Sequence, residues 1–127
     1  MRSPLVERLV ADLGYPLVTA ETREAIIAAP GPTVLFVTGD PAKNLETDDV
    51  AVILPELVAA FPELRPAVVD RTIEQSIRET FDVWPTPSLI FVDRGARIGA
   101  VPKVRGWDDY LAAIGAILAD TQPAPVH

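Results

Sequence analysis

The stretch "VLFVTGDPAKNLETDDVAVILPELVAAF" (Val34 to Phe61) changes from the pattern of a strand to that of a helix. Its start, together with the preceding residues (32–38, PTVLFVT), is a continuous apolar and β-branched run, which is typical of a strand covered on both faces. A Gly-Asp-Pro turn follows, and apolar residues then recur at helical spacing. The stretch therefore predicts a buried strand, a polar loop and an amphipathic helix in succession.

Three features characterise the predicted helix. Thr47 is the expected N-cap, and Asp48 and Asp49 fall in the first turn, where carboxylates interact favourably with the helix dipole. Pro55 lies inside the helix, although proline in an exposed helix interior costs about 3 kcal/mol. The side expected to be buried consists of Val50, Ile53, Leu54, Leu57, Val58 and Phe61.

The rest of the chain alternates between helix and strand patterns. Helices are predicted at 1–14, 20–31, 47–61, 71–81 and 107–120, and strands at 14–19, 32–38, 64–70, 87–93 and 96–104. This alternation predicts an α/β fold with helices on both faces of a central mixed sheet. Right-handed crossovers would make the first strands parallel, and the closing hairpin would add antiparallel strands at one edge, followed by the last helix.

Several side chains within these segments have expected positions. In the first helix the buried line is Leu5, Leu9 and Leu13, and in the fourth helix Glu74 is placed to pair with Arg78. The last helix is expected to bury Trp107, Tyr110, Leu111, Ile114, Ile117 and Leu118.

Length and composition limit the possible functions. With 127 residues, of which 49% are hydrophobic, the chain is expected to form a single domain over residues 1–120, with a disordered tail at 121–127. The absence of cysteine excludes thiol chemistry and cysteine-based metal sites, and the lone histidine, His127, leaves no zinc triad. No stretch is long enough for a membrane span and the charged N-terminal helix does not resemble a signal peptide, so a cytoplasmic protein is expected.

Charge is unevenly distributed along the chain. The net charge of −7 argues against a nucleic-acid partner. Most of it lies in residues 39–63, where Lys43 is the lone cation among six acids: Asp40, Glu46, Asp48, Asp49, Glu56 and Glu63. The basic hairpin, residues 94–105, instead carries Arg94, Arg97, Lys103 and Arg105. Such cations on an edge strand discourage aggregation, although they could also bind an acidic partner.

The predicted architecture is that of thioredoxin, and the segment "FDVWPTPSLIFV" (81–92) strengthens the resemblance. In thioredoxins an X-Pro bond directly before a buried strand is cis, so the Thr86–Pro87 bond is expected to be cis, and the backbone beside it is expected to offer hydrogen bonds to an extended peptide. Thioredoxins also bend their active-site helix at a proline like Pro55. The Cys-x-x-Cys pair of a thioredoxin is absent.

Most of the chain, residues 15–118, resembles the HyaE and HupG family of hydrogenase expression proteins. The resemblance is carried by "GDPAKNLETDDVAVILPELVAAF", "FDVWPTPSLIFVDRGARIGAV" and "GWDDYLAAI". It implies a chaperone, with no reaction or cofactor, that binds the twin-arginine signal peptide of the small-subunit precursor of an uptake nickel-iron hydrogenase. The residues expected to bind this peptide are Asp40, Glu46, Asp48, Asp49, Trp84, Thr86, Pro87 and Gly106.

Other interpretations remain open for these residues. Asp48 and Asp49 could simply stabilise a helix N-terminus, Asp40 could be an ordinary turn residue, and Trp84 could pack beneath its loop. The protein could be an adaptor that bridges hydrogenase maturation factors, or a thioredoxin relative that binds another peptide. An enzyme is not expected, because no nucleophile, base and oxyanion donor can be assembled from these residues.

Overall fold

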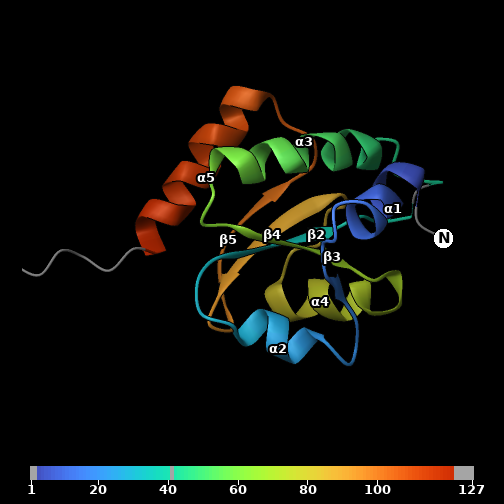
Figure 1. Cartoon of the computed structure of the whole chain (residues 1–127), viewed down its shortest axis with the longest axis horizontal. Helices are drawn as coiled ribbons and strands as arrows, with labels where there is room; N and C mark the ends of the chain where they lie inside the picture. Colours follow the sequence, from blue (N-terminus) through green and yellow to red (C-terminus); the bar gives the residue numbers. More distant parts are fainter. Residues whose placement is uncertain (1–2, 41, 122–127) are drawn as a thin grey trace, which may run out of the picture.

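The computed structural model describes residues 3–40 and 42–121, which form one mixed sheet between two layers of helices (Figure 1). The strands lie in the order β1-β3-β2-β4-β5. As predicted, β3 pairs in parallel with β1 and β2, whereas β4 runs antiparallel to both β2 and β5. The strand bounds are β1 Leu17–Val18, β2 Thr33–Val37, β3 Arg65–Val69, β4 Ser88–Asp93 and β5 Ala96–Pro102.

The helices follow the predicted order, with one short 3-10 turn added before the fourth. Their bounds are α1 Pro4–Ala11, α2 Arg23–Ala28, α3 Thr47–Ala60, the 3-10 turn Arg71–Ile73, α4 Glu74–Phe81 and α5 Trp107–Thr121. Figure 1 shows α1, α3 and α5 above the sheet and α2 and α4 below it. None of the helices in the described ranges is long and apolar enough to cross a membrane.

Each face of the sheet has its own apolar core. Along β2, Val34 and Phe36 face the core under α1, α3 and α5, whereas Leu35 and Val37 face the core over α2 and α4. All five residues of β2 are buried, as its uninterrupted apolar run predicted. Because β2 is central and covered on both faces, the loop that follows it begins at a fixed point in the molecule.

The helix containing the internal proline is confirmed, and its buried side is narrower than predicted. Val50, Leu54 and Leu57 are fully buried, whereas Ile53, Val58 and Phe61 are only partly buried against the same core. Pro55 lies within α3 as expected.

Three expectations about the ends of elements are wrong. Leu13 is 41% exposed because α1 ends at Ala11, so Leu13 lies beyond the helical face that buries Leu9. Trp107 is 40% exposed, since it is the first residue of α5 and precedes the buried stripe that begins at Tyr110. The first strand has only two residues.

At the C-terminus, α5 includes Thr121, so the described structure passes the predicted domain boundary by one residue. The rest of the predicted tail, 122–127 with His127, lies outside the described residues.

Close packing of β5 against α5 yields a test of the fold. A Cβ at Gly99 would lie 2.5 Å from Ile117 Cγ1, so Gly99→Ala should displace the helix side chain and destabilise the protein by about 1–3 kcal/mol. Gly115→Ala is the matched control, because a Cβ there meets nothing within 4 Å and alanine is a better helix former. Urea unfolding should show a clear loss for the first variant and none for the second; equal stabilities would contradict this packing.

Candidate peptide-binding site

The acidic loop, residues 40–49, joins the end of β2 to the first turn of α3 and carries four of the predicted site residues. The chain enters it through Gly39, which is buried and has a φ of +75°. A Cβ at Gly39 would lie 2.6 Å from Asn44 Nδ2 and 2.7 Å from Thr86 Cβ. Glycine is therefore required here both by the backbone conformation and by the close approach of two neighbouring loops.

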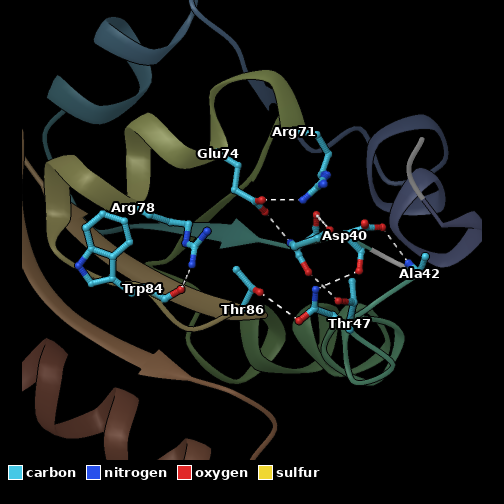
Figure 2. Close-up of polar contacts among 11 residues, drawn as sticks. Asp40, Ala42, Thr47, Arg71, Glu74, Arg78, Trp84 and Thr86 are labelled. Atoms are coloured by element: carbon cyan, nitrogen blue, oxygen red, sulfur yellow. Dashed lines mark hydrogen bonds and ion pairs between the residues drawn. The ribbon is translucent and has the colours of Figure 1, made fainter.

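The carboxylate of Glu74, at the start of α4, holds this turn in place (Figure 2). Glu74 is 6% exposed, and its Oε1 accepts a hydrogen bond from Gly39 N at 2.5 Å. Its Oε2 pairs with Arg71 Nη1 at 2.6 Å. A buried carboxylate needs such partners, because removing an ion from water is otherwise costly. The loop is thus tied to a helix on the opposite face of the sheet.

The predicted pair between Glu74 and Arg78 is wrong. The Glu74 side chain is buried against Gly39 and is neutralised by Arg71, so it does not lie along the exposed face of the helix. Arg78 instead donates a hydrogen bond from Nη2 to the carbonyl of Trp84.

Thr47 is not the N-cap that the sequence predicted. The helix begins at Thr47 itself, and the capping position is taken by Glu46, whose side chain makes no cap hydrogen bond. Thr47 is buried, and its Oγ1 donates to Thr38 O at 2.6 Å. The hydroxyl therefore fastens the start of α3 to the end of β2.

Asn44 lies in the loop three residues before Thr47, the first residue of α3. Asn44 Nδ2 donates to Asp40 O at 2.9 Å, and Asn44 Oδ1 accepts from Thr86 Oγ1 at 3.0 Å. The amide of Asn44 and the hydroxyl of Thr47 are therefore both used in hydrogen bonds that hold the loop between β2 and α3.

The bond between Asn44 and Thr86 joins the acidic loop to the proline loop, residues 84–87 (Figure 2). The Thr86–Pro87 peptide bond is cis, as expected from the resemblance to thioredoxins. Pro87 is buried and Thr86 is half-buried. Two of the predicted site residues, Thr86 and Pro87, therefore lie directly beside the acidic loop.

The four acids of the site differ in their exposure and in the hydrogen bonds that their carboxylates make within the protein. Asp40 is half-buried, and its Oδ1 accepts from Ala42 N at 2.9 Å, which is an ordinary turn contact. Glu46 is exposed, with Oε1 3.4 Å from Val104 N. Asp49 is also exposed, whereas Asp48 is half-buried, and its Oδ1 is shielded from solvent without a hydrogen-bond partner among the described residues. The turn explanation thus holds for Asp40, and Asp48 and Asp49 lie in the first turn of α3 as the helix-dipole explanation requires. Glu46 and Asp49 are the carboxylates most accessible to a ligand.

Trp84 lies on the surface and does not pack beneath its loop. Its side chain is 46% exposed, and Nε1 donates to Asp82 Oδ1 at 2.9 Å. The Arg78 guanidinium lies over the ring, 5.6 Å from its centroid (Figure 2). A fixed and partly exposed indole can add apolar contact to a ligand at a low cost in conformational entropy.

Gly106 lies further along the chain, in the exposed turn between β5 and α5. A Cβ there would meet Asp109 Oδ2 at 3.5 Å, which is ordinary contact, so the structure does not require glycine at this position. This turn reaches the acidic loop through the contact between Val104 N and Glu46.

The basic hairpin is partly used by the fold itself. Arg97 Nη1 donates to Phe81 O at 2.8 Å and to Asp82 O, the carbonyls at the end of α4. Lys103 Nζ donates to Thr86 O at 2.9 Å. Arg94 lies 3.4 Å from Asp93, whereas the exposed Arg105 side chain makes no such bond within the described part of the chain.

Sequence reasoning missed two exposed apolar residues near the acids. Leu45 is 85% exposed within the acidic loop, and Val52 is 54% exposed on α3. An isolated leucine between Asn44 and Glu46 was a usable signal, because a loop residue with no apolar neighbours has nothing to pack against.

Two further observations bear on the chemistry of this site. Among residues 3–40 and 42–121, no group of histidine, cysteine and carboxylate side chains could hold a metal ion. Tyr110, on α5, has a raised pKa because it is buried, and its hydroxyl donates to Lys103 O, just after β5, at 3.3 Å. The site thus combines carboxylates, a proline loop and an exposed indole.

Comparison with known proteins places the chain among hydrogenase accessory proteins. Residues 5–110 match the family model described as hydrogenase-1 expression protein HyaE. Hydrogenase expression/formation protein HupG of Rhodobacter capsulatus is 47% identical, over 91% of this chain and 86% of its own. Hydrogenase expression/formation protein HoxO of Azotobacter vinelandii is 44% identical, over 94% of this chain and 80% of its own.

Solved structures agree with these matches. The crystal structure of a HupG hydrogenase expression/formation protein from Rhodopseudomonas palustris is 40% identical, with a TM-score of 0.60 over 85% of this chain and 99% of that one. Thioredoxin from Trypanosoma brucei brucei is 19% identical, with a TM-score of 0.64 over 84% of this chain and 88% of that one. The second likeness shows the fold alone, and it confirms the thioredoxin-like α/β architecture predicted from the sequence.

The anchoring role of Glu74 can be tested directly. Glu74→Ala leaves the buried Gly39 N–H and Arg71 without their acceptor, so we expect a loss of about 1–3 kcal/mol in the free energy of unfolding. Hydrogen exchange at the Gly39 amide should also become faster. Glu79→Ala is the control, since Glu79 is an exposed residue of the same helix and its loss should change stability by less than about 0.5 kcal/mol. Unchanged Gly39 exchange in Glu74→Ala would contradict the anchor.

Proposed function

The chain belongs to the HyaE, HupG and HoxO family of hydrogenase expression/formation proteins, and we propose that it is a non-catalytic chaperone for the small-subunit precursor of an uptake nickel-iron hydrogenase. In this proposal it binds the precursor's twin-arginine signal peptide in the cytoplasm, before export. The observation that carries the proposal is the hydrogen bond from Thr86 to Asn44, which puts carboxylates beside a cis-proline loop. One ligand can then contact both.

The cationic part of such a peptide suits the acids of the loop. A guanidinium can bind a carboxylate through two parallel hydrogen bonds, and Glu46 and Asp49 are the exposed carboxylates of the loop, with the half-buried Asp48 beside Asp49. Exposed ion pairs contribute only about 0.2–1 kcal/mol each, so two arginines would supply at most about 2 kcal/mol. Micromolar binding requires about 8 kcal/mol. The acids would therefore set orientation and association rate more than affinity.

Affinity must then come from apolar burial and backbone pairing. Signal peptides have an apolar middle segment, and burying apolar surface contributes about 25 cal/mol per Å². Trp84 and Leu45 supply exposed apolar surface on the proline loop and the acidic loop respectively. The backbone at Thr86 would add hydrogen bonds to an extended chain, as sheet edges do for bound peptides.

No reaction is assigned in this proposal. The sequence has no cysteine, and positions 44 and 47 hold an amide and a hydroxyl that are already hydrogen-bonded to the protein. The peptide would be held and released unchanged.

The adaptor interpretation is favoured by one observation, the exposed Arg105 on the basic hairpin. Arg97 and Lys103 bind carbonyls of their own chain, which leaves Arg94 and Arg105 as the cations best able to meet another protein. An adaptor would lose other maturation proteins when Arg94 and Arg105 are replaced by alanine, and would be unaffected by changes in the acidic loop. The chaperone predicts the reverse.

The contribution of the acids can be measured as an association rate. Asp48→Asn with Asp49→Asn should slow binding to the immobilised cognate signal peptide about threefold to tenfold at low salt, because electrostatic steering is weakened. The salt dependence of the association rate should become shallower as well.

The control for this change is Glu21→Gln with Glu24→Gln, which removes the same charge from two exposed residues. Glu24 lies in α2 and Glu21 just before it, and α2 covers the face of the sheet opposite to α3 (Figure 1). If both double variants slow association equally, the effect reflects net charge and the acidic loop is not the contact.

Trp84 should act on the dissociation rate instead. Trp84→Ala removes an exposed indole, and we expect the bound signal peptide to dissociate about tenfold faster, as for truncation of an aromatic contact in other interfaces. Trp84→Phe keeps an aromatic face and should retain most of the residence time. Dissociation rates measured on the same immobilised peptide test this, and an unchanged rate for Trp84→Ala would remove Trp84 from the site.

A further inference from the structure

Lys103 closes off part of the surface that a peptide would need. Its side chain reaches across from the end of the basic hairpin, and Nζ donates a hydrogen bond to Thr86 O at 2.9 Å. Thr86 is the residue before the cis-proline, so this carbonyl belongs to the backbone that an extended ligand would pair with. The acceptor is therefore already occupied from within the chain.

The backbone holds Lys103 in this position. Lys103 N donates to Pro87 O at 2.8 Å. The main chain of Lys103 thus binds the carbonyl of Pro87, and its side chain binds the carbonyl of Thr86. Its φ of +66° lies in the left-handed region that residues other than glycine seldom adopt. Tyr110 Oη donates to Lys103 O, and the adjacent Val104 N contacts Glu46, so this turn is fastened to α5 and to the acidic loop.

The two bonds made by Lys103 differ in how easily they can open. The backbone bond to Pro87 O lies directly beyond the last pair of the β4–β5 ladder, Ser88 with Pro102, and so extends it by one bond. Lys103 is an exposed residue with its ammonium at the end of a flexible stem, so the ammonium can leave Thr86 O and return to water without disturbing the fold.

We propose that Lys103 is an intramolecular competitor for the Thr86 carbonyl, and that an extended peptide binds fully only when it displaces the Lys103 ammonium with one of its own backbone N–H groups. This inference rests on the proposed peptide-binding function. Lys103 would then determine specificity. A ligand must make enough contact with the apolar surface and with the acidic loop to offset the loss of the bond between Lys103 and Thr86. Short cationic segments, which contact only the acids, would not bind.

The test compares Lys103→Met with the wild-type protein by calorimetric titration of the cognate twin-arginine signal peptide. Methionine is close in length to the apolar stem of lysine and lacks the donor, so the affinity should rise about threefold to tenfold. Arg105→Met is the matched control, since it removes one cation from the same turn without freeing a carbonyl. It should give less than half of that gain.

A series of peptides with single N-methylated backbone amides separates the hydrogen bond from the charge effect. For one N-methylated peptide, Lys103→Met should bind no more tightly than wild type, because this peptide lacks the N–H that would bond to the freed Thr86 carbonyl. Equal gains in affinity for Lys103→Met and Arg105→Met, or a gain for Lys103→Met that survives methylation at every position, would overturn the competition. If neither wild type nor Lys103→Met binds any signal peptide, the proposed function fails and this inference fails with it.

Discussion

The hydrogen bond from Gly39 N to the buried carboxylate of Glu74 is the contact on which the arrangement of this site depends. It fixes the point where the chain leaves the central strand, and Arg71 balances the charge that burial would otherwise make costly. From that fixed turn, Asn44 reaches Thr86 and Thr47 reaches back to β2. The buried Glu74 carboxylate thus fixes the start of the acidic loop, and with it the position of the acids that this loop carries.

The chain has a thioredoxin-like fold and contains no cysteine. The acidic loop and the cis-proline loop lie side by side in this fold, joined by the hydrogen bond between Thr86 and Asn44. In the proposed function, charge and apolar contact would have separate roles: exposed carboxylates would act over distance and be screened by salt, whereas the indole of Trp84 would act only after contact. Lys103 adds a third element, a bond that a ligand has to replace.

The sequence predicted what depends on local pattern. Alternating apolar periods predicted the order of helices and strands. The cis bond at Thr86–Pro87 was expected only through the resemblance to thioredoxins, because local pattern does not determine the isomer. The sequence did not predict contacts that join distant segments: Glu74 could only be paired with a helical neighbour, since nothing local marks Gly39 as its partner. The same holds for Lys103 and Thr86, which are brought together by the β4–β5 hairpin. The exposure of Trp107 was missed because helical spacing does not reveal where the covering layer ends.

Calorimetric titration of the protein with the twin-arginine signal peptide of its cognate hydrogenase small subunit would decide whether this surface binds the precursor. A peptide with two lysines in place of the arginines and one with a scrambled apolar segment serve as comparisons. We expect micromolar or tighter binding, lost mainly on scrambling and moderately weakened by the lysine pair. No binding of the native peptide, or equal binding of all three, would contradict it.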